Sequence, residues 1–480
     1  MNRPDATAIA AAIRSGALRA VDHARATLDA IDAANPGLNA YHEVFHDAAL
    51  GRAAMVDAQV AAGRDPGPLA GVCVAVKDNI ATTIGRTTCS SRMLGGYRSP
   101  FDATVVTRLL AAGAVIVGKT NMDEFAMGSS SETCAWGVVR NPHDPTRTPG
   151  GSSGGSAAAM AAGLCDLSLG SDTGGSIRQP AAFCGIVGLK PTYGRISRWG
   201  LVAFGSSLDQ IGPFAATVRD AALAYQVMAG VDAHDSTSAA VAVDDWQATP
   251  PADPRTLRVG VPSQYLRNND PAVTASLERA LGLLRDAGAT IVDVDLPMTD
   301  HGISTYYVIA PAEASSNLAR FDGIRYGHRA AQRAGEGLDE LYARSRSEGF
   351  GAEVQRRIML GTYVLSSGYY DAYYDRALRI RRLIKQEFDT AFARCDVILG
   401  PTAPTAAFTI GGVTDPLQMY MNDVYTVNTN IAGIAGLSLP GGFDRSSGHA
   451  LPVGLQLQAP AFAEGRLLRV SELLERLLSA

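Results

Sequence analysis

A glycine- and serine-rich block at residues 150–188 constrains the fold of this 480-residue chain more than any other segment. It reads GGSSGGSAAAMAAGLCDLSLGSDTGGSIRQPAAFCGIVG. A flexible linker has no regular pattern, whereas this block contains a helix-like stretch at 156–162 and a strand-like stretch at 164–169. Its glycines therefore indicate tight turns and close backbone approach, because glycine tolerates positive φ.

Helix-like and strand-like segments alternate along the rest of the chain, which is typical of α/β folds. Because the strand-like segments are spread over the whole length, the sequence predicts one large α/β domain over residues 1–480, with a mixed central β-sheet flanked by helices. Helical segments are expected at about 1–62 and at about 304–394. Strands are expected at 69–76, 114–117, 164–169, 257–261, 290–296, 397–399, 436–439 and 453–457.

Composition and charge exclude several other classes of protein. The formal net charge of -5 gives no global attraction to nucleic acid, although a local basic patch is compatible with it. The N-terminus lacks the pattern of a secretory signal, and no stretch approaches about 18 uninterrupted apolar residues. The 6 cysteines form no C-x-x-C pair, so we expect buried thiols and no metal site. These features predict a cytoplasmic protein that does not associate with membranes.

Two glycine-rich turns carry serines that suit acyl transfer. The first turn contains Ser152, and the second is Asp172-Thr-Gly-Gly-Ser176. Consecutive backbone N–H groups in such a turn can form an oxyanion hole, and the glycines let a substrate approach the main chain. Ser176 also precedes a helix-like segment at 177–183, whose positive end favours a nucleophile.

A serine needs a base to remove its proton, and histidine is the usual one. Neither turn contains a histidine, and His143, the nearest in sequence, has the surroundings of a loop residue. A buried, neutral lysine can replace histidine, and Lys77 is the best candidate because it ends an apolar strand. A lysine at a strand end is often only a solvated charge. Its neighbour Asp78 is a possible ion-pair partner, which would raise the lysine pKa and oppose the base role.

Residues 113–120 match the G-x-x-x-x-G-K-[ST] pattern of a phosphate-binding loop. In such a loop, the middle residues form a turn between a strand and a following helix. Here they are Ala-Val-Ile-Val, which favour a strand, and the helical pattern precedes them. We therefore do not expect nucleotide binding at this site.

The block at 150–188, extended by LKPTYGR, resembles the signature of the amidase-signature family. The resemblance implies a Ser–Ser–Lys triad with Ser176 as nucleophile, Ser152 as proton relay following a cis peptide bond, and Lys77 as general base. The spacings, 152−77=75 and 176−152=24 residues, agree with the family pattern. The resemblance also implies an oxyanion hole formed by the backbone N–H groups of Thr173, Gly174, Gly175 and Ser176.

Segments at 119–129, 306–320, 356–363, 366–374 and 400–404 are similar to one subfamily, the A subunits of glutamyl-tRNA(Gln)/aspartyl-tRNA(Asn) amidotransferases. This resemblance implies hydrolysis of glutamine, with Arg356 binding its α-carboxylate, Asp423 its α-ammonium group and Tyr307 lining the pocket. It also implies two further subunits, B and C, which amidate a misacylated tRNA. No cofactor is expected in this chain, because ATP and Mg²⁺ would bind a partner subunit.

Two other functions are compatible with the same family pattern. One is a free-standing amidase that hydrolyses small amides, which the subfamily segments at 306–374 disfavour. The other is a non-catalytic scaffold subunit, which the presence of Lys77, Ser152 and Ser176 together disfavours.

Overall fold

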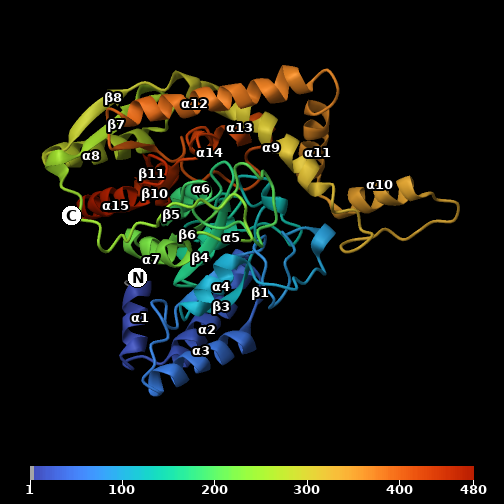
Figure 1. The fold of residues 1–480 in the computed structure, drawn as a ribbon, viewed down its shortest axis with the longest axis horizontal. Coiled ribbons are helices and arrows are strands. Elements are labelled where there is room, and N and C mark those ends of the chain that lie inside the picture. The colour runs from blue at the N-terminus through green and yellow to red at the C-terminus, as the bar shows by residue number, and fades with distance from the viewer. Residues whose placement is uncertain (1–4) are drawn as a thin grey trace.

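An 11-stranded mixed β-sheet runs through the computed structural model, which describes residues 5–480 (Figure 1). Its strands are β1 (Tyr41–Val44), β2 (Cys73–Lys77), β3 (Val115–Thr120), β4 (Leu167–Asp172), β5 (Val187–Lys190), β6 (Gln210–Ala215), β7 (Arg258–Pro262), β8 (Thr290–Val294), β9 (Val397–Pro401), β10 (Ala435–Asp444) and β11 (Leu451–Ala459). The predicted α/β class with a mixed central sheet is confirmed.

The strand order is β1-β3-β2-β4-β6-β5-β10-β11-β9-β7-β8. β2 runs parallel to β3 and β4, and β7 runs parallel to β8 and β9, while the remaining neighbours are antiparallel. β2 to β6 are buried along their whole length, because helices cover both faces of the sheet. The late strands β10 and β11 lie between β5 and β9, so the C-terminal part of the chain contributes strands to the middle of the sheet.

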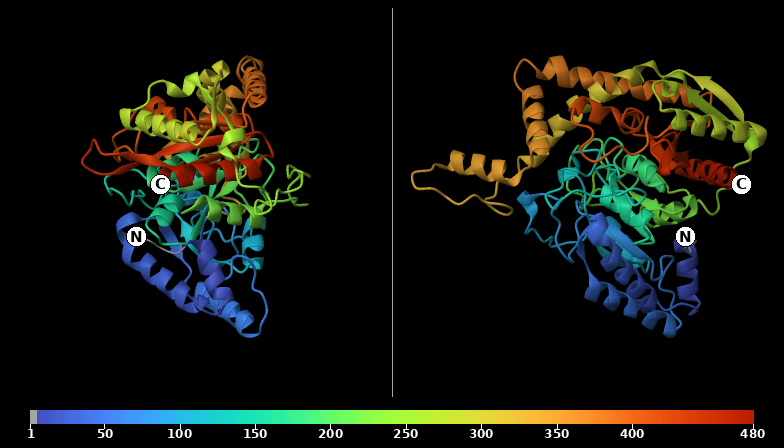
Figure 2. Two further views of the ribbon diagram at one scale, coloured as in Figure 1. Left: turned by 90° about the vertical axis from the view of Figure 1, so that its left-hand side faces the viewer. Right: turned by 180° about the vertical axis from the view of Figure 1, so that it is seen from behind.

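Helices form layers on both sides of the sheet and at both of its ends (Figures 1 and 2). α1 to α3 lie at one end, α9, α11 and α12 at the other, and α15 packs against β10. α10 and the loop before it project from the body of the molecule. The helices are α1 (Ala6–Arg14), α2 (Ala20–Leu38), α3 (His46–Ala61), α4 (Thr104–Ala111), α5 (Gly154–Ala161), α6 (Arg178–Cys184), α7 (Val218–Met228), α8 (Pro271–Asp286), α9 (Gly302–Leu318), α10 (Leu338–Gly349), α11 (Ala352–Val364), α12 (Arg376–Phe392), α13 (Pro416–Met421), α14 (Val427–Ile431) and α15 (Glu464–Ser479).

The structure corrects the sequence prediction at several elements. The segment predicted as helical at 1–62 contains the strand β1, and its first four residues lie outside the described part of the chain. β5 and β6 were not predicted, because they are short and β6 contains Gly212 and Pro213, which are uncommon inside strands. The region at 304–394 is interrupted by an irregular segment at 319–337 and by a π-helical turn at Tyr370–Asp375.

Other expectations concern cysteines and membranes. All six cysteine side chains are buried, as expected. Within residues 5–480, none of the helices combines the length and the hydropathy needed to cross a lipid bilayer.

Candidate active site

The sheet brings the three predicted catalytic residues together. Lys77 is the last residue of β2, Ser176 follows the end of β4, and Ser152 precedes α5. β2 and β4 are parallel neighbours, so their carboxyl ends meet at one edge of the sheet, where ligands bind in α/β folds. Lys77 and Ser152 are fully buried, and Ser176 is 8% exposed.

The Lys77 amine lies in a nest of oxygen atoms. Lys77 Nζ is 2.8 Å from Ser152 Oγ, 2.8 Å from Ser153 Oγ and 3.0 Å from Ser171 Oγ. It also lies 3.3 Å from the Ser171 carbonyl oxygen. Asn79 Nδ2 donates a hydrogen bond to Ser171 Oγ at 2.9 Å and so fixes that hydroxyl group. The amine is therefore held in contact with the predicted relay serine.

Burial lowers the pKa of Lys77 to about 7, against the opposing effect of nearby Asp123, Asp172 and Asp209. Removal of water disfavours the charged ammonium, whereas carboxylates at a distance favour it. Desolvation is the larger effect, so a substantial fraction of Lys77 is uncharged at neutral pH. An uncharged amine can accept a proton, which is the property that a general base needs.

The peptide bond between Gly151 and Ser152 is cis, as the resemblance implies. Three hydrogen bonds made by backbone groups of this loop hold it in place. The Gly151 N–H donates to Gln179 Oε1 at 3.0 Å, and the Ser152 carbonyl accepts from the Asp123 N–H at 3.2 Å. The Ser153 N–H donates to the Ser176 carbonyl at 3.2 Å, which ties the two glycine-rich turns together.

The second contact of the predicted relay is not formed. Within residues 5–480, the Ser176 hydroxyl makes no hydrogen bond to Ser152 Oγ. Catalytic hydrogen bonds in substrate-free enzymes are often long or poorly aligned and tighten in the enzyme–substrate complex. The Lys77–Ser152 contact is thus present in this structure, and the Ser152–Ser176 contact stays a prediction.

The turn before Ser176 has the free backbone donors of an oxyanion hole, with one correction. The N–H groups of Thr173, Gly174 and Ser176 have no acceptor within residues 5–480. Gly175, predicted to contribute as well, donates its N–H to Asp172 Oδ1 at 2.9 Å. Three donors remain for an oxyanion, because the fourth already stabilises the turn.

Asp172 holds this turn in place through hydrogen bonds to its backbone. Its carboxylate accepts hydrogen bonds from the backbone N–H of Ile177 at 3.1 Å and from Arg178 Nη2 at 3.0 Å. The Arg178 guanidinium holds the Asp172 pKa below its usual range, although burial alone would raise it. Asp172 is therefore a charged support for the nucleophile turn.

Asp423 lies beside the same turn with one oxygen unpaired. Its Oδ2 accepts a hydrogen bond from Ser129 Oγ at 2.5 Å, while Oδ1 finds no partner within residues 5–480. A Cβ on Gly175 would lie 3.1 Å from that Oδ1, so the carboxylate borders the nucleophile turn. Burial raises the pKa of Asp423 to about 7. An unpaired buried carboxylate is the group expected to bind a substrate ammonium.

A cavity of about 270 Å³ lies beside Ser129, the hydrogen-bond partner of Asp423. Ser129, Arg356 and Arg357 all line it. Arg356 has a side chain that is 53% exposed, and its guanidinium contacts Glu353 through one Nη atom only. Its remaining donors can bind an anion in the cavity.

Arg357 is 3% exposed and is held by an ion pair and by aromatic rings. It pairs with Glu353 Oε1 at 2.8 Å, and its guanidinium lies 5.2 Å from the centre of the Tyr307 ring. Tyr307 stacks on Tyr420 with ring centres 3.7 Å apart. Arg357 thereby orders Tyr307, which the sequence placed at the pocket.

Sequence reasoning missed Ser153, Ser171, Asp172 and Arg357 as members of the site. Helical spacing could have revealed Arg357, because Val354, Arg357, Gly361 and Val364 are the buried positions of α11 and recur at intervals of three and four. Ser171 carried no such signal, since its contact with Lys77 depends on how β4 lies beside β2.

Other candidates occupy structural positions. Asp78 does not pair with Lys77, because its carboxylate lies 2.8 Å from His42 Nε2 and 3.7 Å from Lys119 Nζ. The phosphate-loop match ends in the buried strand β3, so residues 115–120 form no phosphate-binding turn. His143 lies in a loop, with Nε2 3.0 Å from the Cys184 carbonyl oxygen.

Potential metal ligands gather at one place in residues 5–480, formed by His23, Cys73 and Asp166. Asp166 Oδ2 already lies 2.7 Å from His23 Nε2 and accepts the Cys73 N–H at 2.7 Å. None of the three residues contacts Lys77, Ser152 or Ser176 through a hydrogen bond.

Comparison with known proteins agrees with this geometry. The profile of the family described as Amidase matches residues 22–468. The chain is 55% identical over 462 residues to the A subunit of glutamyl-tRNA(Gln) amidotransferase from Synechococcus sp. (strain RCC307), covering 96% of this chain and 94% of that protein. It is 54% identical over 466 residues to the corresponding protein of Carboxydothermus hydrogenoformans, covering 97% of this chain and 95% of that protein.

Solved structures show the same likeness. The crystal structure of the glutamyl-tRNA(Gln) amidotransferase A subunit from Thermotoga maritima has a TM-score of 0.77 and 42% identity, covering 93% of this chain and 89% of that one. The native peptide amidase from Stenotrophomonas maltophilia has a TM-score of 0.86 and 32% identity, covering 100% of this chain and 97% of that one.

Proposed function

Because the chain belongs to the amidase family, we propose that it is the glutamine-hydrolysing subunit of a tRNA-dependent amidotransferase. The observation that carries the proposal is the placement of two groups around one turn. A buried lysine–serine cluster is tied to the Ser176 turn by a backbone hydrogen bond, and Asp423, with one carboxylate oxygen unpaired, borders the same turn. Such a site can cleave an amide and bind an ammonium at the same time.

The reaction begins with proton transfer along the serines. Uncharged Lys77 accepts the proton of the Ser152 hydroxyl, which takes the proton of Ser176 as the substrate draws the two serines into contact. Ser176 Oγ attacks the amide carbon, and the negative charge forming on the carbonyl oxygen is stabilised by the N–H groups of Thr173, Gly174 and Ser176. The relay then returns a proton to the amide nitrogen, and ammonia leaves. Water releases the acyl group from Ser176 by the reverse proton path.

Glutamine fits the charges around this chemistry. Asp423 binds the α-ammonium group with the oxygen that has no other partner. Arg356 binds the α-carboxylate with the guanidinium donors that Glu353 leaves free. We assign Tyr307 to the same pocket, because its ring packs on Tyr420 and Arg357, which both line the cavity. The amide of the side chain then points toward Ser176.

The chain works as one component of a larger complex. Its relatives carry the name of an amidotransferase A subunit, so we assign two further subunits, B and C, as its partners. Ammonia from glutamine would amidate Glu-tRNA(Gln), Asp-tRNA(Asn) or both on one of these partners. That partner would bind the ATP and Mg²⁺ which amidation needs, and this chain would bind no cofactor. The complex would act in the cytoplasm.

Ammonia release tests the proposal directly. Glutamine, asparagine and propionamide are each supplied to the chain alone and to the chain with its candidate partner subunits and tRNA, with Ser176→Ala as the blank. We expect glutamine to be favoured, and release to rise when the partners are present. Rapid cleavage of propionamide without cleavage of glutamine would leave the triad in place but show that the chain is a free-standing amidase.

A further inference from the structure

One face of the segment at 423–431, which includes α14, meets the turn that carries Ser176. Asp423, Thr426 and Asn430 follow one another at intervals of three and four residues, so their side chains lie on the same face of a helical segment. The segment is continuous, because the N–H groups of Thr426 and Val427 both donate to the Asp423 carbonyl at 3.0 Å. The three side chains therefore belong to one element.

The first and last of these side chains both contact the nucleophile turn. Asn430 Nδ2 donates to the carbonyl oxygen of Asp172 at 3.1 Å and to its Oδ1 at 2.9 Å. Asp423 borders Gly175 with the carboxylate oxygen to which we assign the substrate ammonium. The segment that carries the proposed ammonium ligand thus also holds Asp172, which supports the turn.

Thr426, between them in sequence, holds the main chain of the turn itself. Its buried Oγ1 lies 2.7 Å from the Gly174 carbonyl oxygen and 3.1 Å from that of Asp423. A hydroxyl has a single proton, and the shorter contact is the one with Gly174. At the other end of the same peptide group, the Gly175 N–H donates to Asp172 Oδ1 at 2.9 Å. Hydrogen bonds at both ends therefore fix the orientation of this peptide plane.

The fixed peptide group lies between two N–H groups of the proposed oxyanion hole. The Gly174 N–H precedes it along the chain, and the Ser176 N–H follows it. Glycine has more backbone conformations than any other residue, and Gly175 has a φ of 144°, which other residues rarely adopt. Two successive glycines without an external contact would be free to point these N–H groups elsewhere.

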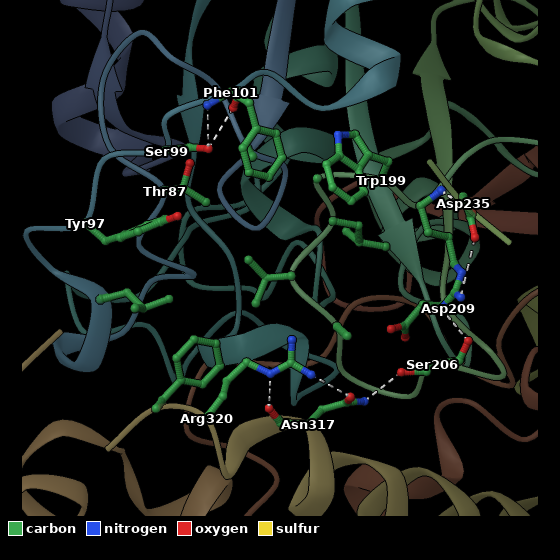
Figure 3. A pocket seen from close by; sticks show the side chains of 18 of the residues that line it. Thr87, Tyr97, Ser99, Phe101, Trp199, Ser206, Asp209, Asp235, Asn317 and Arg320 are labelled. Carbon is green, nitrogen blue, oxygen red and sulfur yellow. Dashed lines mark hydrogen bonds and ion pairs between the residues drawn. The ribbon is translucent and has the colours of Figure 1, made fainter. Parts of the chain in front are cut away.

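Thr173, at the start of the turn, is held separately. Its Oγ1 donates to Asp209 Oδ1 at 2.6 Å. Asp209 lines a second cavity, of about 420 Å³, which shares no lining residue with the glutamine pocket (Figure 3). This contact holds a side chain, whereas the Thr426 contact holds the main chain that supplies the oxyanion donors.

We propose that Thr426 is a positioning residue, which holds the Gly174 carbonyl so that the N–H groups of the turn face the developing oxyanion. The inference rests on the proposed function, because it takes Ser176 as the nucleophile. Attack of Ser176 on the amide and attack of water on the acyl group both place negative charge on the same oxygen. A displaced turn would therefore slow both steps, since its donors stabilise the transition state only when they are already aligned.

Removal of the Thr426 hydroxyl group tests this role. Thr426→Val is compared with wild type in the complex with the candidate partner subunits, and kcat and KM are measured for glutamine and propionamide. We expect kcat to fall by about 10- to 100-fold for both substrates, since small displacements of catalytic groups have effects of this size. KM for glutamine should change little, because Asp423 and Arg356 are retained. Thr426→Ser keeps a hydroxyl group and should recover most of the lost kcat.

Thr429 provides the matched control, because it lies in the same helix and is equally buried. Its Oγ1 accepts a hydrogen bond from Gln458 Nε2 at 2.6 Å, and within residues 5–480 it makes none to the turn at 172–176. Thr429→Val should lower the melting temperature as Thr426→Val does, but leave kcat unchanged. If Thr426→Val does not fold, Thr426→Ala carries the same expectation, because it removes the hydroxyl group and adds no bulk.

Unchanged kcat in Thr426→Val would overturn the proposal, and so would a failure of Thr426→Ser to recover activity. An equal loss of kcat in Thr429→Val would overturn it as well, because the effect would then come from general loosening of α14. A rise in KM for glutamine alone would show that Thr426 acts through Asp423 and not through the turn. A wild-type complex that hydrolyses propionamide but not glutamine would instead contradict the proposed function, and kcat for propionamide would still decide the role of Thr426.

Discussion

At the scale of single residues, the chemistry depends on a lysine whose surroundings decide its charge. Lys77 would be protonated at neutral pH on a protein surface, yet burial brings its pKa to about 7. The strand end places it beside Ser152, and the hydroxyls of Ser153 and Ser171 keep the amine in position. Exclusion of water is therefore what makes this lysine suited to the proposed role of base.

This environment predicts different pH profiles for two substrates. Lys77 becomes uncharged as pH rises through about 7, so kcat/KM for propionamide should rise tenfold per pH unit below that value. Asp423 becomes charged over the same range, so glutamine should show a steeper rise that approaches a hundredfold per unit. Steady-state kinetics between pH 5 and pH 9 would measure both slopes. Asp423→Asn should reduce the glutamine slope to that of propionamide, and equal slopes in the wild type would contradict the role of Asp423.

The two neighbouring arginines should respond differently to removal. Arg356→Ala should raise KM for glutamine by about 10- to 100-fold, since a charged hydrogen bond contributes about 1.5–3 kcal/mol. It should change propionamide hydrolysis and the melting temperature little. Arg357→Ala should lower the melting temperature and slow both substrates, because it removes the buried partner of Glu353 and the guanidinium that packs on Tyr307. Equal losses with both substrates for Arg356→Ala would show that Arg356 has a structural role.

At the scale of elements, the proposed glutamine pocket depends on how closely α11 approaches α9. A Cβ on Gly361 would lie 1.9 Å from the Pro311 carbonyl oxygen, so only glycine permits this contact. α11 carries Arg356, and α9 carries Tyr307. The distance between the two helices therefore sets the position of the pocket residues.

Gly361→Ala should force the helices apart and destabilise the protein by about 1–3 kcal/mol, the usual cost of overpacking. It should also raise KM for glutamine more than it affects propionamide. Gly282→Ala in α8 is the control, because its Cβ would have nothing within 4 Å. That variant should be stabilised by about 0.5–1 kcal/mol, since alanine favours helix. Denaturant unfolding measures both changes, and similar stabilities for the two variants would contradict the packing argument.

At the scale of the whole molecule, the order of strands joins distant parts of the chain. β10 pairs with β5 and β11 pairs with β9, so C-terminal strands occupy the centre of the sheet. The buried ion pair between Arg195 and Glu464, 3.2 Å apart, adds a contact between the middle of the chain and α15. Unfolding of any one strand would expose the buried faces of the strands and helices beside it.

This topology predicts one cooperative unfolding transition for the whole chain. Urea unfolding followed by far-ultraviolet circular dichroism and by tryptophan fluorescence should give coincident curves, because both halves share one sheet. Trp246, which is 5% exposed and lies 4.3 Å from the Arg469 guanidinium, reports on the packing of α15. Two separated transitions would show that the chain contains independent domains.

The sequence by itself determined the alternation of helices and strands and the two glycine-rich turns. These features are local, since periodicity and turn chemistry are properties of neighbouring residues. The roles of Lys77, Ser152 and Ser176 were predicted from the resemblance of the sequence to a known family. Only the tertiary structure decided that Asp78 pairs with His42 and Lys119, that Gly175 donates to Asp172, and that Arg357 orders the pocket. Charge, pKa and partner choice follow from the packing of segments far apart in sequence, which no local pattern contains.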